Sequence, residues 1–536
     1  MLDDAAPVLA AAFVAGVRAE GLEPDPALRL LRRPPVHAPA VPQLPGPDAL
    51  GPLHEELVTA EDRTRRGAWY TPAWLAEAIV ERAIPDTAAA RRGPVLDPAC
   101  GGGVFLLAAA DRLVTLGCTP AQALASLRGV DVDPTAVAVT EAALWWWGAR
   151  RGSRTVLTEQ VRVGDALLGT GMPERPGTVV GNPPFLGQLR SATTVDAERR
   201  AQLRARYGDA VRAYTDPAWL FVLEASEQVL LDGRVALVQP QSFLAARDAA
   251  AIRRQLDGCM DLVDAIVDDG GAFDAGVSVC APVLQRRDPS RPPAGPNDWV
   301  APLADAAGVP RVHLRGTTTL GDIASVHAGF RDEFYGLADA VSEEAADGPG
   351  PDRPRLVTAG AVDPFTVLDR PQRFAGRRWT RPVVDVGRLA GRAARWAEVQ
   401  AGPKVLVATQ TRVLEAVADP GGELLGSVPV LCVRPVDPDG VWHLLAVLLA
   451  PAASAWLLRR SAGTALSADA CRPTAALLAD LPLPEDAARW DEAAAAARCL
   501  TRHGGDPTAF AALADAAYGI DDPALTTWWQ ERRPRR

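Results

Sequence analysis

The sequence predicts an α/β protein with a doubly wound, mostly parallel sheet, followed by a mixed α+β region. Between residues 94 and 267, short apolar runs alternate with segments of helical length, which is the pattern of βαβ units. Acidic residues end three successive runs, at Asp97, Asp131 and Asp165. The alternation stops after Arg286, where a segment rich in Pro, Asp, Gly and Asn begins. We therefore expect a Rossmann-like domain and a second, separate domain.

The expected elements follow from the positions of these runs. A glycine-rich turn at 101–103 separates the first strand from a helix over 104–116. A second helix runs through the three tryptophans at 145–147, and a third covers 219–230. The expected strands are 94–97, 127–131, 161–165, 178–181, 234–239, 261–267 and 277–284 in the first domain, and 404–408 and 428–433 in the second, which also has an expected helix over 444–459.

Changes in composition set the expected domain boundaries. A short helix and a Pro-rich connector occupy residues 1–56, and the α/β domain covers 57–287. The polar segment 287–298 is typical of a linker. The second domain is expected over 300–485, followed by a helical tail over 486–536.

Composition argues against several classes of protein. The net charge of −10 disfavours a chain that is basic overall, although a local basic patch is compatible with it. The seven cysteines are scattered without a C-x-x-C pair, which disfavours a zinc site and a disulfide framework. The first residues lack the basic start of a signal peptide, and no apolar run reaches membrane-spanning length. A cytoplasmic protein without a bound metal or membrane partner is therefore expected.

The segment Asp97–Gly103 lies at the sheet edge where folds of this class bind ligands. Glycines let the backbone approach a ligand closely, and carboxylates at Asp131 and Asp165 suit ribose hydroxyls and an adenine amino group. The loop is not G-x-G-x-x-G, so a pyrophosphate is not required. The acids suit the sulfonium and amino groups of S-adenosylmethionine, which is the expected cofactor. Thr71 and Pro72, ahead of the first strand, are expected to close the other side of this pocket.

The stretch Asn182-Pro183-Pro184-Phe185 follows the apolar run 178–181, at the end of a predicted strand. An amide, a proline carbonyl and an aromatic ring meet within four residues. This combination suits the binding of a planar amino group, although Asn-Pro and Pro-Pro pairs also mark ordinary turns. These four residues form the candidate catalytic turn.

With these motifs in this order, the chain resembles the N6-adenine DNA methyltransferases of the gamma order. In that order the cofactor-closing element precedes the glycine motif, and the target-recognition domain comes last. The matching segments are 67–72, 95–105, 129–134, 163–167, 180–185, 232–244 and 273–284, with weaker likeness at 320–324, 329–330, 402–407, 463–464 and 481–484. The resemblance implies an adenine-specific, site-specific DNA methyltransferase of type II or IIG, acting in restriction-modification or phage defence.

The resemblance also implies roles for individual residues. Asn182 and Pro183 would accept hydrogen bonds from the target amino group, and Phe185 would stack on the flipped adenine. Phe273 would pack against the same base. Phe185 stands where Tyr is common in the family, and Asp131 stands where Glu is common. The cofactor pocket would comprise Tyr70, Thr71, Asp97, Ala99, Gly101, Asp131, Val132, Asp165 and Ala166.

The implied partner is double-stranded DNA, with a separate restriction nuclease or other defence proteins as further candidate partners. Arginine dominates the cations and makes bidentate contacts with phosphate and guanine. Between 371 and 396, only Asp385 opposes a cluster of arginines. A cytoplasmic, nucleoid-associated location is expected for such a protein. The candidate DNA contacts are Arg190, Arg199, Arg204, Arg377, Arg378, Arg381, Lys404, Gln410 and Arg412.

Two alternatives remain open at this point. A methyltransferase with the same turn could act on another planar amine or amide, with N4-cytosine, an RNA base or protein glutamine as the target. The long second domain disfavours that alternative. A DNA-specificity subunit without turnover is the other alternative, and the intact set of Asp97, Asp131, Asp165 and Asn182 argues against it.

Overall fold

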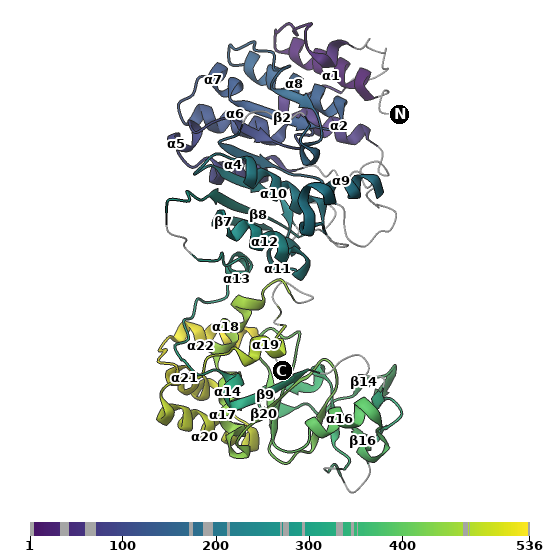
Figure 1. Ribbon diagram of the computed structural model, residues 1–536, viewed down its shortest axis with the longest axis vertical. Coiled ribbons are helices and arrows are strands. Elements are labelled where there is room, and N and C mark those ends of the chain that lie inside the picture. Colours follow the sequence, from purple (N-terminus) through teal and green to yellow (C-terminus); the bar gives the residue numbers. More distant parts are fainter. Residues whose placement is uncertain are drawn as a thin grey trace. The chain divides into compact units, whose positions relative to one another are not determined.

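The computed structural model describes residues 5–32, 42–58, 71–170, 175–185, 197–211, 215–268, 271, 278–291, 295–328, 336–344, 348–350, 352–464, 470 and 472–533. The chain divides into two compact units, which we call unit 1 (Met1–Pro302) and unit 2 (Leu303–Arg536). In Figure 1, unit 1 runs from purple to teal, and unit 2 runs from green to yellow.

Unit 1 is built on one eight-stranded sheet, in which the order is β3-β2-β1-β4-β5-β8 and both β6 and β7 pair with β8. The pairs from β3 to β5 are all parallel, whereas β8 is antiparallel to β5. This confirms the doubly wound, mostly parallel sheet. The strands are β1 (Val95–Asp97), β2 (Leu127–Asp131), β3 (Val161–Val163), β4 (Thr178–Gly181), β5 (Arg234–Leu237), β6 (Gln239–Pro240), β7 (Met260–Asp268) and β8 (Val279–Arg286).

The helices of unit 1 divide between the two faces of this sheet. Helix α6 (Val104–Thr115) follows β1, and α8 (Pro134–Ala149) follows β2; both pack on the strands they connect, with α4 (Ala73–Ala83) beside α6. Helix α10 (Pro217–Gln228) follows β4, where the order of strands runs the other way. Because such crossovers are right-handed, α10 and its neighbour α12 (Ala250–Asp257) cover the opposite face. The shorter helices are α5 (Thr87–Ala90), α7 (Pro120–Ala125), α9 (Ala197–Tyr207) and α11 (Ser242–Ala245).

The first described residues form part of the hydrophobic core of unit 1. Helices α1 (Ala5–Ala19) and α2 (Leu50–Leu57) pack against α8, which is apolar all round and almost entirely buried. Phe13 meets Trp145 and Trp146 edge to face, with ring centroids 6.0 Å apart in both pairs. The helix and connector expected as a separate N-terminal segment therefore support α8 directly.

The expected linker 287–298 makes side-chain bonds to unit 1 where the structure describes it. Arg287 forms an ion pair with Asp261 of β7 at 2.5 Å. The Asn297 side-chain amide donates to the Asp257 carboxylate at 2.9 Å. The polar composition of this segment reflects side chains that bond to the ends of α12 and β7.

Unit 2 contains two four-stranded sheets, ordered β10-β16-β11-β19 and β18-β17-β20-β9, and two short hairpins, β12-β13 and β14-β15. Helices pack around the second sheet, with α17 against β17, β18 and α20. The strands are β9 (Ala324–Ala328), β10 (Val341–Glu343), β11 (Arg355–Val357), β12 (Val362–Asp363), β13 (Thr366–Val367), β14 (Gln372–Phe374), β15 (Arg377–Trp379), β16 (Pro382–Val384), β17 (Lys404–Val407), β18 (Ala416–Asp419), β19 (Leu424–Gly426) and β20 (Leu431–Pro435). The helices are α13 (Ala301–Ala306), which spans the unit boundary, α14 (Leu320–Ile323), α16 (Gly391–Val399), α17 (Val441–Leu449), α18 (Pro451–Ser461), α19 (Ala475–Ala479), α20 (Ala487–His503), α21 (Thr508–Ala517) and α22 (Pro523–Arg532).

The helix expected over 444–459 is two helices, which corrects the sequence prediction. Ala450 has an extended backbone between α17 and α18, and Pro451 opens α18. Proline lacks the N–H of a helical hydrogen bond and disfavours a helical residue before it, so the chain turns here. Among the described residues, no single helix is long and apolar enough to cross a membrane; the segments Pro438–Leu449 and Pro451–Ser461 meet that length and composition only as a pair bent by 63°.

The contact between α1 and α8 can be tested at Gly16. A Cβ atom at Gly16 would lie 2.5 Å from the ring of Trp146. Gly16→Leu should therefore lower the free energy of unfolding by about 1–3 kcal/mol through overpacking. Ala15→Leu, at an exposed position of the same helix, should change it by less than about 0.5 kcal/mol. Calorimetric unfolding of both variants measures these changes in the free energy of unfolding. Equal losses in the two variants would contradict the close contact between Gly16 and Trp146.

Candidate functional site

The strand order of unit 1 reverses between β1 and β4, and the carboxyl ends of these two strands lie side by side. Ligands of doubly wound sheets bind in the crevice at such a reversal. Gly181, the last residue of β4, has a φ of +154°. A Cβ atom there would stand 2.5 Å from Asp97 Oδ1, so only glycine leaves room for that carboxylate. Asp97 and the catalytic turn after Gly181 are therefore neighbours.

Asp97 has an almost completely buried carboxyl group, with 1% of the residue exposed. The backbone N–H of Ala99 donates to its Oδ1 at 3.0 Å. Burial raises the pKa of Asp97 to about 8, the Ala99 hydrogen bond acts against this rise, and the nearby Asp131 carboxylate adds to it. At neutral pH the group is mostly protonated, and a cation placed beside it would favour its ionised form.

The glycine loop after β1 is fixed by bonds from neighbouring elements. The Gly101 backbone N–H donates to Asp131 Oδ2 at 2.9 Å, and the Thr140 hydroxyl donates to the Gly101 carbonyl at 2.6 Å. Gly101 has a φ of +49°, and no heavy atom lies within 4 Å of the position that its Cβ would take. Gly102 lies against Gly51 of α2, where a Cβ would come within 2.4 Å of the Gly51 Cα. Space is thus open beside Gly101, whereas Gly102 is packed closely against α2.

Asp131 and Val132 follow at the end of β2. Asp131 Oδ1 accepts from the backbone N–H of Asp133 at 2.8 Å. Val132 is 61% exposed, which is unusual for a large apolar side chain and leaves it available to pack on a planar ligand. Both residues stand at the same edge of the sheet as Asp97, since β1 and β2 are parallel neighbours.

Asp165 lies just beyond β3 and is joined to Asp131 through the backbone. The N–H of Gly164 donates to the Asp131 carbonyl at 2.9 Å. Asp165 Oδ1 accepts from the Leu167 N–H at 3.1 Å, and Oδ2 lies 2.6 Å from Arg199 Nη1 on α9. The carboxyl end of each of the three strands thus carries one of the expected acids. Ala166, the next expected cofactor contact, is buried.

The catalytic turn is oriented by the element ahead of β1. The Asn182 side-chain N–H donates to the Thr71 hydroxyl at 2.9 Å, and Thr71 is only 4% exposed. In this arrangement the amide nitrogen of Asn182 faces Thr71. The sequence predicted that Thr71 closes the other side of the cofactor pocket, and the structure shows its contact with Asn182. Pro183 and Phe185 are buried, and Phe185 packs in the hydrophobic core of unit 1, whereas Pro184 is half-buried.

Three expected site residues, Tyr70, Phe273 and Arg190, lie outside the described residues. Two residues that sequence reasoning missed contact the glycine loop, namely Thr140 and Gly51. Thr140 is a buried hydroxyl in a largely apolar, tryptophan-rich helix, and that polar position was a usable signal. Gly51 carried no signal, because its importance depends on how α2 packs.

The structure removes Lys404 from the candidate DNA contacts. Its side chain is fully buried, and its Nζ lies 2.5 Å from Asp419 Oδ2 on the neighbouring strand β18. An ammonium group without solvent access and with a bonded carboxylate partner does not reach a phosphate or a base edge. Lys404 was selected because it lies on a strand of the second domain, but strand position alone does not tell which face is buried.

The other candidate DNA contacts lie at the surface to different degrees. Arg204 on α9 is exposed, as are Arg377 and Arg378 on β15 and Arg412. Arg381 is half-exposed and forms ion pairs with Asp369 and Glu344. The remaining two are Gln410, which has a φ of +65°, and Arg199, which is bound to Asp165.

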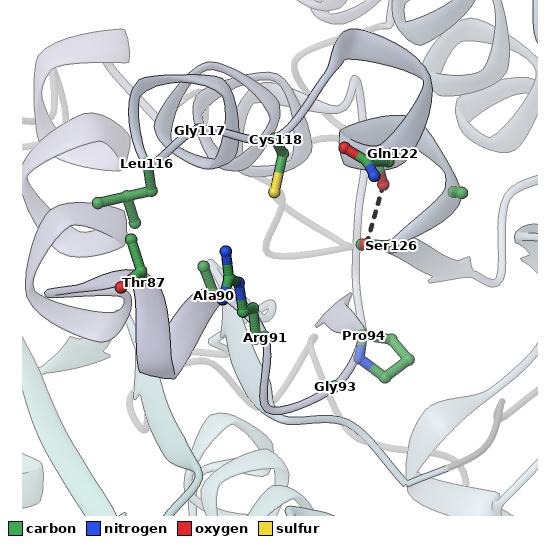
Figure 2. Close-up of a pocket in the computed structure, with 11 residues that line it drawn as sticks. Thr87, Ala90, Arg91, Gly93, Pro94, Leu116, Gly117, Cys118, Gln122 and Ser126 are labelled. Carbon is green, nitrogen blue, oxygen red and sulfur yellow. Dashed lines mark hydrogen bonds between the residues drawn. The ribbon is translucent and has the colours of Figure 1, made fainter.

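A cavity of about 500 Å³ lies away from this site (Figure 2). Pro94 and Ser126, which line it, directly precede β1 and β2, so the cavity stands at the amino ends of the strands. The Ser126 hydroxyl donates to the Gln122 carbonyl at 2.9 Å. Because Asp97, Asp131 and Asn182 stand at the carboxyl ends, this cavity is separate from the candidate site.

Residues 46–289 match the family model "N-6 DNA Methylase", and the match contains every acid of the site and the Asn-Pro-Pro-Phe turn. These residues, somewhat less than half of the chain, are similar to the N-6 DNA methylases. Unit 1 is therefore a methyltransferase domain, with the methylase match extending over α2 and the whole of the parallel sheet. No curated protein matches the chain by sequence.

Solved structures give a likeness of fold. The type IIL restriction-modification enzyme MmeI, solved in complex with DNA, has a TM-score of 0.51 and 13% identity, covering 95% of this chain and 84% of that one. The type IIG restriction endonuclease BpuSI has a TM-score of 0.45 and 12% identity, covering 99% and 78%. A modification subunit of a putative type I restriction enzyme from Vibrio vulnificus YJ016 has a TM-score of 0.33 and 20% identity, covering 47% and 50%.

The methylase fold and family imply S-adenosylmethionine as the methyl donor, and the residues of the site fit this molecule. Its sulfonium and ammonium groups are cationic, which suits the buried Asp97 carboxyl group. Asp131 and Asp165 provide acceptors for hydroxyl and amino groups, and the exposed Val132 provides an apolar surface. The open side of Gly101 leaves space beside the loop.

The raised pKa of Asp97 has a consequence for stability. Its folded-state value of about 8 lies above the unfolded value of about 4, so the unfolded chain ionises first as the pH rises. The ligand-free wild type should therefore lose stability between pH 4 and 8, by up to about 1.4 kcal/mol per pH unit from this group. Asp97→Asn removes that loss, so the variant should gain in melting temperature over the wild type as the pH increases.

Melting temperatures of both proteins from pH 5 to 8 test this expectation. Asp209→Asn, at an exposed position, is the matched control for loss of one carboxylate. A gap between Asp97→Asn and the wild type that stays constant over this range would show that Asp97 is not held protonated.

Proposed function

We propose that the chain is a site-specific DNA methyltransferase that transfers a methyl group from S-adenosylmethionine to the N6 amino group of an adenine in duplex DNA. The observation that carries the proposal is the Asn182-Pro183-Pro184-Phe185 turn beside the buried Asp97, within a domain of the N-6 DNA methylase family. Restriction-modification or phage defence is the role that we propose for the reaction, with cytoplasmic DNA as its substrate. A separate restriction nuclease or other defence proteins are the further partners proposed.

The chemistry that we propose rests on hydrogen-bond acceptors held in place before the reaction. The adenine amino nitrogen is a weak nucleophile, because its lone pair is delocalised into the ring. The Asn182 amide oxygen and the Pro183 carbonyl would each accept a hydrogen bond from one N–H group of this nitrogen. These two hydrogen bonds would favour a nitrogen whose lone pair is available for attack. Positive charge then develops on this nitrogen, and fixed acceptor dipoles stabilise it. S-Adenosylmethionine supplies the electrophilic methyl group.

The contact between Thr71 and Asn182 supports this role, because it orients the amide without help from the substrate. The target adenine must leave the duplex, since its amino group is otherwise paired. We assign Phe185 and Phe273 to stacking on the extruded base. Phe185 is 8% exposed, so this assignment requires the base to approach the edge of the ring that the core leaves uncovered.

We assign target recognition to residues 300–485 within unit 2, the catalytic domain to 57–287 and a helical tail to 486–536. The hairpin of β14 and β15 supports DNA contact there. Arg373 stands directly opposite Arg378 across the hairpin, next to Arg377, and all three are exposed. Like charges at opposed positions destabilise a hairpin unless an anion binds between them. Among the described residues, no acidic side chain pairs with these arginines, so DNA phosphate is the partner that we propose.

Asn182→Ala tests the catalytic turn. Loss of one preorganised acceptor should lower the rate of adenine methylation by about 100-fold or more, with the dissociation constant of S-adenosylmethionine unchanged. Methyl transfer to plasmid DNA, followed by mass analysis of the released nucleosides, identifies both the rate and the base modified. Thr71→Val should lower kcat less than Asn182→Ala, and Thr71→Ser, which keeps the hydroxyl, should restore it. Full activity of Asn182→Ala, or methylation of cytosine alone, would overturn the proposal.

The paired change Arg373→Gln with Arg378→Gln tests the hairpin. Removing two phosphate contacts should weaken DNA binding and reduce the slope of log affinity against log salt by about 2, without loss of thermal stability. Arg381→Gln is the matched control, because its guanidinium is already bound to Asp369 and Glu344. Titrations of fluorescent duplex DNA at several salt concentrations supply the slopes. Equal slopes for the double variant and the wild type would exclude this hairpin from the interface.

A further inference from the structure

Helix α9 is the first described element after the catalytic turn, and its carboxyl end is anchored to the catalytic domain. Arg206 makes two bonds to Glu224 of α10, at 2.7 and 3.1 Å. The Tyr207 hydroxyl donates to the same carboxylate at 2.6 Å and lies 2.8 Å from the carbonyl of Leu167, in the turn after Asp165. Glu224 and Tyr207 are buried, at 3% and 8% exposed, whereas the Arg206 side chain is 40% exposed.

At the amino-terminal part of α9, Arg199 contacts the cofactor site. Arg199 Nη1 lies 2.6 Å from Asp165 Oδ2, and the side chains are 40% and 14% exposed. Asp165 is the carboxylate that the sequence analysis assigned to the adenine amino group of S-adenosylmethionine. Two donors would therefore compete for this carboxylate, the Arg199 guanidinium in the ligand-free protein and an adenine amino group in the complex.

We infer that Arg199 is an exchange ligand that links cofactor binding to DNA binding. Asp165 holds Arg199 until the adenine amino group of the cofactor takes the carboxylate, and the released Arg199 then binds a DNA phosphate. The inference rests on the proposed function, because it uses the same cofactor site and the same DNA. It goes further by assigning to one arginine a contact that changes during the binding sequence.

The geometry makes this exchange easy. Arg199 is nearly half exposed, and ion pairs of that kind contribute little to stability because water screens them and long side chains lose freedom. The buried hydrogen bond from Tyr207 to Glu224, with the second donor Arg206 on the same carboxylate, keeps α9 in place when Arg199 leaves. Arg200 and Arg204 are exposed and lie four residues apart on the same helix, where their charges repel one another. An anion bound along α9 would reduce this repulsion.

Thermodynamic linkage fixes whether DNA tightens or weakens the binding of the cofactor. If the cofactor releases Arg199 for DNA, then DNA, by drawing Arg199 away, must tighten cofactor binding by the same factor. The effect is measurable with S-adenosylhomocysteine, which keeps the adenine but has no methyl group to transfer. Its dissociation constant is determined by calorimetry without DNA and with saturating plasmid DNA that the wild type methylates.

In the wild type, DNA should tighten binding of S-adenosylhomocysteine by about fivefold or more. Arg199→Gln removes the competitor, so this variant should bind S-adenosylhomocysteine more tightly than the wild type without DNA, and DNA should leave its affinity unchanged. Arg200→Gln removes one charge from the same helix but leaves the Asp165 contact, so the effect of DNA should persist. Arg199→Lys keeps an ion pair and should restore most of the coupling.

Equal coupling in Arg199→Gln and the wild type would overturn the inference, as would a wild type whose affinity for S-adenosylhomocysteine does not respond to DNA. Weaker binding by Arg199→Gln without DNA would also overturn it and would make Arg199 a positioning residue for Asp165. Failure of the proposed function looks different: the wild type would then bind no S-adenosylhomocysteine or methylate no adenine. Melting temperatures of the variants confirm that each is folded.

Discussion

The candidate site depends on the burial of one carboxyl group between two parallel strands. Asp97 at the end of β1 lies against the backbone of Gly181 at the end of β4, with no room for a side chain between them. This contact exists only where the strand order reverses, because there the two ends are neighbours. It brings a group that favours cations next to a turn that offers hydrogen-bond acceptors to an amine. A methyl donor and a methyl acceptor need that juxtaposition.

The other acids complete the site through backbone bonds rather than through side-chain contacts with each other. Asp131 accepts from Gly101, and its carbonyl accepts from Gly164, so the ends of β1, β2 and β3 are joined in series. The α1–α2 segment supports this series from behind, because Gly51 lies against Gly102 and α8 is packed among aromatic rings.

The local arrangement of charged side chains says more about the surface of each unit than the net charge of the whole chain does. The chain carries a net charge of −10, yet α9 and the β14–β15 hairpin each carry several exposed arginines close together. On the hairpin, Arg373 and Arg378 face each other without an acid among the described residues to offset them. On α9, Arg199 is held by an acid that belongs to the cofactor pocket. The first arrangement suits a permanent phosphate contact, and the second suits one that forms only when the pocket is filled.

The sequence by itself determined the parallel strands, the acids at their carboxyl ends and the place of the Asn182–Phe185 turn, because local periodicity and turn residues report those features directly. It did not determine that Lys404 is buried against Asp419, that Arg199 bonds Asp165, or that α1 and α2 support the glycine loop. Each of these pairs residues that packing brings together, and a strand or helix pattern does not state which neighbour its side chains will meet. Only the tertiary structure decided them, because burial and ion pairing depend on the assembled layers and not on the segment alone.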